Sequence, residues 1–307
     1  MVRHHHISMF THDLKENNQF YMDILGLRRV KITVNQNLPE MYHIFYGDTE
    51  GSAGNDFTFF DYSQYPKRKK GTNAISGYGF FVNSEASLDF WEARLASLNI
   101  QSQREAFFGS TRLVFEDVSG IKLWFELKKE ELPEQWEPWH ENDIPEEHVI
   151  QGMSAAEVTV RDVQAFVDMM ADLFDYYVAE SNESVSVITT DGQATINVHQ
   201  QDGRIEKAGQ GTIHHIAIQI EDDNFDRIKA EIEAKGYKTI HHDRHFFDSL
   251  YFRGANSIML EIVASGAIGL NPEKNKTEYG QKLELPPKFE PRRKELGQVL
   301  TPIEEWI

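Results

Sequence analysis

The stretch His5-His6-Ile7-Ser8 at the start of the chain returns almost unchanged, far along the sequence, as His214-His215-Ile216-Ala217. A third stretch, SIMLEI at 257–262, places one carboxylate, Glu261, inside an apolar run with the pattern of a strand. Polar side chains in such positions need partners, because burying them unpaired costs free energy. Two histidines and one carboxylate are the ligands that hold non-haem Fe(II) while leaving coordination positions open. The three stretches therefore predict a metal site.

The two histidine pairs each open one of four similar segments. In every segment a short strand-like run is followed by a helical pattern and then by further strand-like runs. The opening strands are predicted at 5–10, 75–82, 155–160 and 214–220, and the helices at 14–25, 87–98, 163–174 and 225–235. The later strands are predicted at 29–34, 41–46, 57–62, 112–116, 121–127, 185–189, 195–200, 249–252 and 258–263. Gly26 and Gly236 stand where glycine commonly ends a helix.

This order predicts an α+β fold made of four βαβββ modules. A single module is too small to bury its own sheet, so pairs of modules should close into two incomplete β-barrel domains with the helices outside. We expect an N-terminal domain at 1–130, a linker at 131–150 that is rich in Glu, Pro and Trp, and a C-terminal domain at 151–265. The extension at 266–307 carries a helical pattern at 291–300 and is expected to strap over a domain surface or a partner subunit.

Composition limits the possible partners and locations. The formal charge of −18 argues against nucleic acid and anionic membranes as partners. The basic run Lys67-Arg68-Lys69-Lys70 is expected to be a solvated linker, because Gly71 follows it and no aromatic residues interrupt it. Without cysteine the chain has no disulfide, thiolate nucleophile or Cys-based metal site. It also lacks an apolar stretch of membrane-spanning length and a secretory signal, so a cytoplasmic location is expected.

The modules and their landmarks resemble the vicinal oxygen chelate superfamily, which includes glyoxalases and extradiol ring-cleaving dioxygenases. Over the whole chain the resemblance is strongest to the hydroquinone-type ring-cleaving dioxygenases. Besides the histidine pairs, the landmarks are LGL at 25–27, YHIFYGD at 42–48, GSAG at 51–54, GTIHHIA at 211–217, DR at 243–244, SLYFR at 249–253, LE at 260–261 and LPP at 285–287. One departure is Asn256-Ser257, where many relatives have two glycines before the strand that bears the glutamate.

The resemblance implies that His6, His215 and Glu261 bind the metal. Fe(II) is the expected ion, with Mn, Zn or Ni as alternatives. Because side chains alternate along a strand, only one histidine of each pair should point into the barrel mouth. His5 and His214 are then candidates for contacts with the ligands or the substrate, or are ordinary surface histidines.

Two further residues are candidates for catalysis. Tyr251 precedes Glu261 on the neighbouring predicted strand and in phase with it, and it could equally be a half-buried strand tyrosine. Arg244 matches a pocket residue of the family, with a solvated arginine as the alternative. His43, His199, His241, His242 and His245 have no repeated counterpart and are expected to be structural.

The other two modules cannot supply a metal set. Trp124 occupies the position of Glu261 in the second module, and Ser154 or Ala155 occupies that of the histidine in the third. Modules one and four should therefore face each other around the metal, and modules two and three should form a metal-free barrel.

The implied function is oxidative cleavage of a dihydroxylated aromatic ring, hydroquinone before catechol, with the small aromatic and O2 as partners. The chain could also form a homo-oligomer. Two alternatives use the same scaffold. One is a glyoxalase-like lyase or isomerase, for which Asp56 and Asp61 are the candidates for a fourth ligand. The other is a metal-free small-molecule-binding protein, against which the intact ligand set argues.

Overall fold

The computed structural model describes residues 2–128, 131–190, 194–243, 248–264 and 276–307. Within them the order of strand, helix and three strands occurs four times. The first repeat contains β1 (Arg3–Thr11), α1 (Leu14–Asn18), β2 (Arg28–Val34), β3 (Tyr42–Gly47) and β4 (Asp56–Asp61). The second contains β5 (Ala74–Val82), α2 (Glu85–Ser97), β6 (Ser102–Phe107), β7 (Ser110–Glu116) and β8 (Lys122–Leu127).

The remaining repeats follow the same order. The third contains β9 (Gly152–Val160), α3 (Val163–Phe174), β10 (Tyr177–Ser181), β11 (Val185–Thr189) and β12 (Ile196–Gln200). The fourth contains β13 (Ile213–Ile220), α4 (Phe225–Ala234), β14 (Thr239–Asp243), β15 (Asp248–Arg253) and β16 (Met259–Ala264). The helix α5 (Arg293–Val299) lies in the C-terminal extension.

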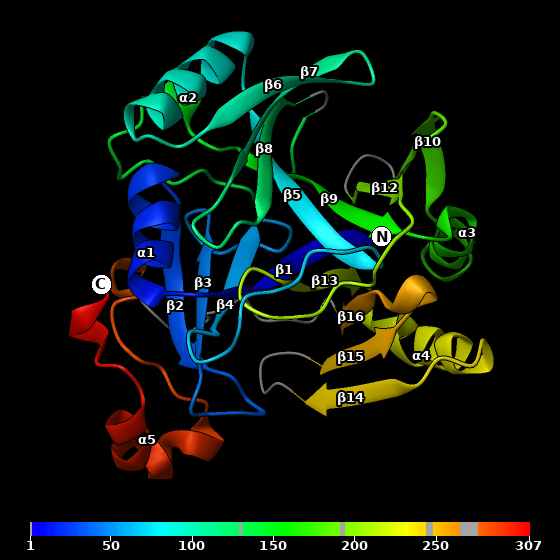
Figure 1. Cartoon of the computed structure of the whole chain (residues 1–307). Helices are drawn as coiled ribbons and strands as arrows, with labels where there is room; N and C mark the ends of the chain where they lie inside the picture. The colour runs from blue at the N-terminus through cyan, green and yellow to red at the C-terminus, as the bar shows by residue number, and fades with distance from the viewer. Residues whose placement is uncertain (1, 129–130, 191–193, 244–247, 265–275) are drawn as a thin grey trace.

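The opening strands determine how the repeats associate. β1 pairs antiparallel with β13, and β5 pairs antiparallel with β9, so repeat one adjoins repeat four and repeat two adjoins repeat three, as predicted. All strands belong to one large mixed sheet, with the helices at its outside (Figure 1). We call β1–β4 with β13–β16 the 1–4 half and β5–β12 the 2–3 half. The division into domains at 131–150 stays a prediction. Among the described helices, none is long and apolar enough to cross a membrane.

The first helix keeps its predicted length but changes type along the way. The side chain of Asp13 accepts a hydrogen bond from the backbone N–H of Glu16 at 2.8 Å and starts α1. After Asn18 the chain continues as a π-helix over Gln19–Ile24. Gly26 follows with φ of +70°, and a Cβ there would lie 2.4 Å from the side chain of Ile144. Glycine is therefore required at this turn by both conformation and space.

Sequence periodicity did not predict β6, β10 and β14, which are the first strands after the helices of repeats two, three and four. The middle of β6 and all of β10 are exposed, and Ile240 in β14 is also exposed. Exposed edge strands do not need one apolar face, so they lack the alternation that marks a half-buried strand. The equivalent strand of repeat one, β2, is mostly buried and alternates apolar with polar residues, and it was predicted.

The C-terminal extension explains why β2 is buried. The backbone N–H of Glu284 donates to the carbonyl of Ile32 at 2.9 Å, so the extension pairs briefly with β2. Farther on, the Tyr42 hydroxyl donates to the carbonyl of Thr301 at 2.7 Å, and the Trp306 ring packs edge-on against the Tyr42 ring. For residues 276–307 the predicted strap over a domain surface is therefore confirmed, and it covers repeat one.

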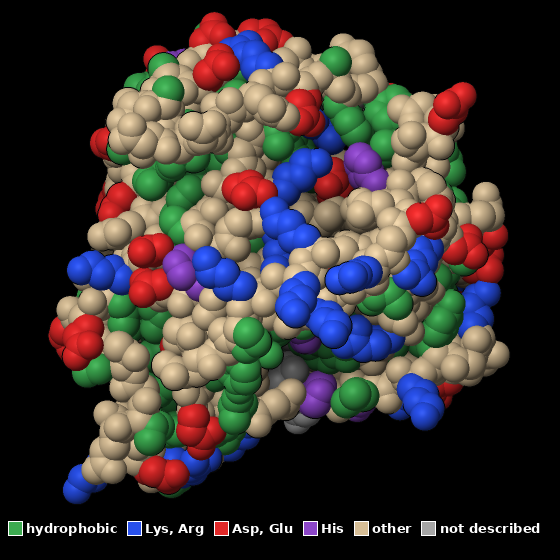
Figure 2. Space-filling view, viewed as in Figure 1, with side chains coloured by type: hydrophobic (Ala, Val, Ile, Leu, Met, Phe, Trp, Pro, Cys, Tyr) green, Lys and Arg blue, Asp and Glu red, His purple; other side chains and the backbone are tan. Residues whose placement is uncertain are grey.

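The basic run is solvated, as predicted. Lys67, Lys69 and Lys70 are exposed, and they lie beside the exposed Arg204 and Lys207 because the two segments form isolated bridges. Figure 2 shows a band of Lys and Arg side chains across the middle of this face. Arg68 is more buried, donating to the carbonyl of Gly120 and lying 3.6 Å from Glu206.

Candidate metal centre and substrate cavity

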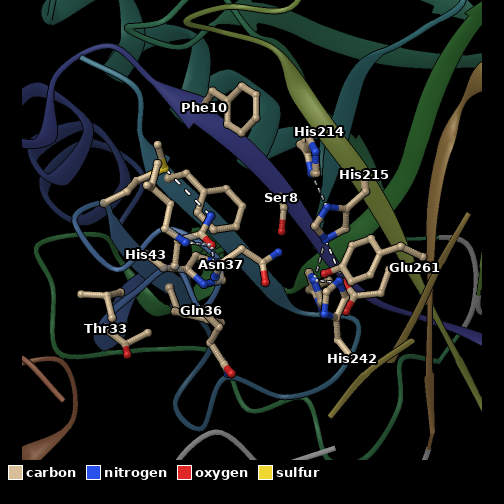
Figure 3. A pocket seen from close by; sticks show the side chains of 18 of the residues that line it. Ser8, Phe10, Thr33, Gln36, Asn37, His43, His214, His215, His242 and Glu261 are labelled. Carbon is tan, nitrogen blue, oxygen red and sulfur yellow. Dashed lines mark hydrogen bonds and ion pairs between the residues drawn. The ribbon is translucent and has the colours of Figure 1, made fainter. Parts of the chain in front are cut away.

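Three buried side chains from three neighbouring strands meet at one point. Nε2 of His6 and Nε2 of His215 lie 3.1 Å apart. Oε2 of Glu261 lies 3.1 Å from the first nitrogen and 2.9 Å from the second. Among the described residues, these three form the one group of His, Asp or Glu side chains whose ligand atoms converge in this way. Figure 3 shows His215 and Glu261 directed toward each other.

The strand register produces this convergence. β13 lies between β1 and β16, and Ala217 on β13 is paired with both His6 and Glu261. The small side chain of Ala217 leaves space between the imidazole and the carboxylate. His215 precedes Ala217 by two residues and therefore points to the same side of the sheet. The repeat sequence HH-I thus places its second histidine at the centre of the 1–4 half twice.

The three atoms have the spacing of metal ligands. Ligand atoms about 2.1 Å from one ion and at right angles to each other lie about 3.0 Å apart, which is the spacing found here. Oε2 of Glu261 is buried, and its neighbours at hydrogen-bond distance among the described residues are the Nε2 atoms of His6 and His215. A buried carboxylate oxygen is costly unless a cation binds it. The residues therefore fit a divalent ion with a facial His-His-Glu set.

The neighbouring histidines contact the ligand histidines through their Nδ1 atoms. Nδ1 of His5 lies 2.9 Å from Nδ1 of His6, and Nδ1 of His214 lies 2.8 Å from Nδ1 of His215. Both pairs line the same cavity, so the expectation that alternation separates them is wrong. The pairing of β1 with β13 shifts at His5 and again at His214. Such β-bulges turn consecutive side chains toward one side and are common beside functional sites.

Burial and neighbouring charges decide the protonation of these groups. Burial and the neighbouring His6 lower the pKa of His5 to about 3, and burial and the neighbouring His215 lower that of His214 to about 3. Both are therefore neutral near pH 7. Burial alone would raise the pKa of Glu261, but the charges and hydrogen bonds of His6 and His215 outweigh it and hold that pKa well below the usual value. The carboxylate is thus ionised and ready to bind a cation.

His4, the first residue of the histidine run, is buried, and the effect of burial on its protonation can be tested. Its Nε2 lies 3.1 Å from the carbonyl of Thr195, and burial lowers its pKa to about 4 even though that hydrogen bond opposes the shift. Unfolded His4 takes up a proton below about pH 6.5, whereas folded His4 does so only below about pH 4. Its contribution to stability is therefore lost as the pH falls through this window.

We expect His4→Gln, which keeps a donor for the carbonyl of Thr195, to reduce this acid sensitivity. The difference in unfolding free energy between about pH 8 and about pH 5 should shrink by about 2 kcal/mol relative to the parent protein. Urea unfolding of both proteins with EDTA present measures this, because all other titrating groups are shared. An unchanged difference would show that His4 is protonated in the folded protein.

A cavity of about 460 Å³ opens in front of the triad. One wall is aromatic: the Phe10 and Tyr62 rings stack 4.0 Å apart, and the Tyr65 ring stacks on Tyr62 at 4.0 Å. The backbone and side chains of Asn35, Gln36 and Asn37, together with Leu285 and Pro286 of the C-terminal extension, also line it. The size and the mixture of aromatic and polar walls suit a small aromatic molecule.

Tyr251 borders the cavity beside the triad. It is paired with Glu261 across β15 and β16, and its ring lies edge-on to the His215 ring at 5.2 Å and to the His242 ring at 5.5 Å. His242 and His43 line the cavity as well, which was not predicted. Their positions could be inferred only after the strand register was known, since neither belongs to a repeated motif. The predicted site residue Arg244 lies outside the described residues.

Repeat one supplies no carboxylate at the position of Glu261. That position is occupied by Thr58 on β4, which pairs with Ser8 in the way that Glu261 pairs with Ala217. The hydroxyl oxygens of Ser8 and Thr58 are 2.5 Å apart. Asp56 lines the cavity but is outside the converging group, as is Asp61 at the end of β4. Burial raises the pKa of Asp56 well above its usual value, and the nearby Asp48 raises it further. A neutral carboxylic acid is a poor metal ligand.

Several known proteins are similar in sequence to this chain. Residues 3–125 match the family described as "Glyoxalase/Bleomycin resistance protein/Dioxygenase superfamily". The "Putative ring-cleaving dioxygenase MhqA" of Bacillus subtilis (strain 168) is 31% identical over 98% of this chain and 98% of its own length. The "Chlorohydroquinone/hydroquinone 1,2-dioxygenase" of Sphingobium indicum is 24% identical over 95% of this chain and 94% of its own.

Solved structures show the same architecture. A crystal structure described as a "putative dioxygenase" from Bacillus subtilis superposes with a TM-score of 0.90 at 26% identity, covering 98% of this chain and 96% of that one. Glyoxalase I from Zea mays superposes with a TM-score of 0.63 at 9% identity, covering 86% of this chain and 92% of that one. The second likeness concerns the fold alone.

Proposed function

Because this chain belongs to the glyoxalase/bleomycin resistance protein/dioxygenase superfamily, we propose that it is an Fe(II)-dependent dioxygenase that cleaves a dihydroxylated aromatic ring. The convergence of His6, His215 and Glu261 within 2.9–3.1 Å of one another carries this proposal. A facial set of two histidines and one carboxylate leaves neighbouring positions for a substrate oxygen and for O2. The two halves would then be two incomplete barrels, of which the 1–4 half is catalytic.

An Fe(II) ion held by these residues would lower the pKa of a substrate hydroxyl and provide a path for electrons between the ring and O2. The protein contributes orientation. In our assignment the Nδ1–H groups of His6 and His215 donate to the neutral Nδ1 atoms of His5 and His214. This fixes the tautomer of both ligands, so that their Nε2 lone pairs face Glu261 and the ion.

Proton transfer falls to the groups around the open side of the triad. With Nδ1 accepting from His215, the neutral His214 keeps its hydrogen on Nε2 and is a hydrogen-bond donor. Its low pKa, about 3, makes it a poor source of protons near pH 7. We therefore assign the donation of a proton or hydrogen bond to the substrate oxygen to Tyr251, supported by its position beside His215 and His242.

The polar groups on the far wall support hydroquinone over catechol. Thr33, Gln36 and His43 lie across the cavity from Glu261 (Figure 3). A ring whose first oxygen lies at the triad would direct a para hydroxyl toward that wall, whereas both hydroxyls of catechol would stay near the triad. The aromatic side chains of Phe10 and Tyr62 would hold the face of the ring between the two polar ends.

We expect O2 consumption and loss of methylhydroquinone to occur in a ratio of one to one, because both oxygen atoms enter the cleaved product. An oxygen electrode, combined with chromatography of the substrate, measures this on protein loaded anaerobically with Fe(II). Catechol, tested in parallel, should be turned over more slowly. Activity that persists under strict anaerobiosis would replace the dioxygenase assignment with the lyase alternative, for which repeat one lacks a carboxylate ligand.

A further inference from the structure

The 2–3 half repeats the scaffold of the metal site with different residues. Strand pairing shows which positions correspond. The pair Gly79 and Trp124 in repeat two corresponds to the pair Ala217 and Glu261 in repeat four. The pair Glu157 and Asn197 in repeat three corresponds to the pair Ser8 and Thr58 in repeat one. Two residues before Gly79 and Glu157, Gly77 and Ala155 stand where the other half has its ligand histidines. Gly77, Ala155 and Trp124, which stand at the positions of His215, His6 and Glu261, are not metal ligands.

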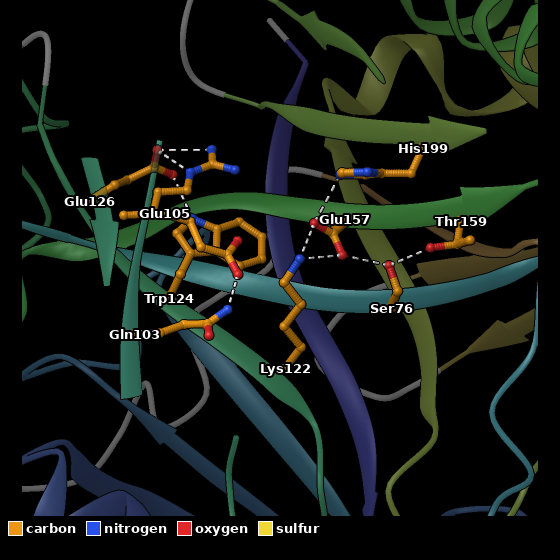
Figure 4. A network of polar contacts seen from close by, with 10 residues as sticks. Ser76, Gln103, Glu105, Lys122, Trp124, Glu126, Glu157, Thr159 and His199 are labelled. Atoms are coloured by element: carbon orange, nitrogen blue, oxygen red, sulfur yellow. Dashed lines mark hydrogen bonds and ion pairs between the residues drawn. The ribbon is translucent and has the colours of Figure 1, made fainter. Parts of the chain in front are cut away.

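The indole of Trp124 fills the space that corresponds to the metal. A Cβ on Gly79 would lie 2.1 Å from Nε1 of Trp124, and one on Gly77 would lie 3.3 Å from its ring. The two glycines thus make room for the indole, whose Nε1 donates to Oε1 of Glu126 at 2.8 Å (Figure 4). Beside it, Glu157 is paired with Lys122 at 2.8 Å and with His199 at 3.0 Å. This part of the half is therefore packed and internally neutralised.

The mouth of the 2–3 half is nevertheless open. It contains a cavity of about 430 Å³, nearly as large as the cavity at the triad. An open pocket of this size, lined by aromatic and polar side chains, has the usual form of a small-molecule site. Residues from β5 to β12 line it, and the segment at 131–136 closes one side, as the C-terminal extension does in the other half.

A rigid buried ion pair forms part of the cavity wall. Nε and Nη2 of Arg112 both lie 2.9 Å from Oε2 of Glu126. The guanidinium is held 3.4 Å from the Phe107 ring centre and 4.8 Å from that of Trp124. Both of these contacts to Glu126 use Nε and Nη2, which leaves Nη1 outside the ion pair. One donor edge of a fixed guanidinium thus remains available to a ligand, while its charge is already neutralised.

Two further polar side chains line the cavity. The Ser154 hydroxyl is buried without a hydrogen-bond partner among the described residues, and so are both polar atoms of the Asn197 amide. Buried polar groups are usually satisfied, so unsatisfied ones at a cavity indicate missing partners. Asn197 offers a donor and an acceptor together. A ligand with a matching acceptor and donor would complete it.

The rim is aromatic at a cost in backbone strain. Phe107 and Phe108 lie at the end of the hairpin between β6 and β7, and the half-exposed Tyr177 on β10 also lines the cavity. Phe108 has φ of +43° and is followed by Gly109 with φ of +75°. Hairpin turns with two positive φ values favour Asn or Gly, and a phenylalanine there is strained. Strain of this kind is retained chiefly where it serves a function.

We propose that the 2–3 half is a second, metal-independent binding site for an uncharged aromatic molecule that carries a carbonyl group, such as an aromatic carboxamide. The carbonyl oxygen accepts from Arg112, and the amide group pairs with the unsatisfied polar atoms of the wall. The ring lies between Phe107, Phe108 and Tyr177. Anions are disfavoured because Glu126 already neutralises Arg112, and because Glu131 and Glu180 add negative charge at the rim.

Benzamide is a suitable probe, titrated calorimetrically into the metal-free full-length protein. We expect one benzamide per chain that methylhydroquinone does not displace, with benzoate and toluene each binding at least about tenfold more weakly. Binding should be the same in His215→Ala, because the site is independent of the triad. This keeps the result separate from the proposed dioxygenase function, which can fail without affecting it.

Two rim variants, one at the exposed Tyr177 and one at the half-buried Phe108, locate the site. Tyr177→Ala should weaken benzamide binding by about fivefold. The matched control is Tyr65→Ala, which removes an exposed tyrosine from the rim of the other cavity and should leave the affinity unchanged. Phe108→Asn should weaken benzamide binding and at the same time raise the Tm by about 2 °C, because it relieves the strained turn.

Four results would each overturn the proposal. In the first three, benzamide does not bind, it competes with methylhydroquinone, or its affinity is affected by Tyr65→Ala and not by Tyr177→Ala. An increase in Tm for Phe108→Asn with unchanged benzamide affinity would also contradict it, since the strained aromatic would then have no part in binding.

Discussion

Glu261→Ala and His215→Ala are each expected to lose iron while the protein stays folded. Each removes one of three ligand atoms that lie 2.9–3.1 Å from one another. Loss of an outer hydrogen-bond partner of a ligand already weakens metal binding by about 10- to 100-fold, so loss of a ligand should exceed about 100-fold. Removing Glu261 also takes away a buried negative charge, so the metal-free fold should not suffer from an unpaired group.

Iron per chain, measured after anaerobic loading and gel filtration, tests this directly. Added Fe(II) should raise the Tm of the parent protein and leave that of the two variants unchanged, because a ligand stabilises only a folded state that binds it. His241→Ala is the matched histidine control: His241 lies on exposed β14 and pairs with Asp248. Asp56→Asn should also keep its iron. If Asp56→Asn lost iron, a fourth ligand and the lyase alternative would be favoured.

Point variants are preferable to shortening the N-terminus. His6 lies close to the start of the chain, but β1 is a central strand paired with β13 on one side and β4 on the other. Deleting residues 1–7 would remove Ile7 from the core together with much of that strand. Loss of iron from such a protein would therefore report unfolding as well as the missing ligand, whereas His6→Ala isolates the ligand.

The sequence predicted the elements that bury one face and missed those that do not. Four helices and the buried strands follow from apolar periodicity. Their order repeats because each repeat must bury one face of its own strands. β6, β10 and β14 escaped prediction because exposed strands carry no periodic pattern. β2 has the same place in its repeat, yet it was predictable because its apolar residues Val30, Ile32 and Val34 alternate with polar ones.

The three residues of the triad could be predicted from the sequence, but most of the residues around them in the cavity could not. The repeated histidine pairs and the single carboxylate in an apolar strand indicated three residues that do converge. The roles of His5 and His214 depend on β-bulges, which shift the side-chain phase by one residue and leave no mark in the sequence. His43 and His242 reach the cavity from strands outside the repeated histidine motif. The same limit applies to the 2–3 half, whose cavity follows from how Trp124 packs.

The second large effect concerns Trp306, which anchors the C-terminal extension. Its side chain is 3% exposed, and its ring lies 5.4 Å from the Tyr42 ring on β3. The extension also forms the wall of the triad cavity at Leu285 and Pro286. Truncation of a buried tryptophan costs about 3–5 kcal/mol, a large part of the total stability of a typical domain. The loss should loosen the segment that covers β2 and shapes the cavity.

We therefore expect Trp306→Ala to lower the free energy of unfolding by about 3–5 kcal/mol, measured by urea unfolding, and to raise KM for the aromatic substrate. Iron content should remain that of the parent protein, because the described part of the extension, residues 276–307, supplies none of the three ligands. Ile307→Ala is the matched control, since the neighbouring side chain is 53% exposed and should change stability by less than about 0.5 kcal/mol. Equal effects of the two substitutions would mean that the extension is not anchored through Trp306. A loss of stability with unchanged KM would instead show that the extension stabilises repeat one without shaping the substrate cavity.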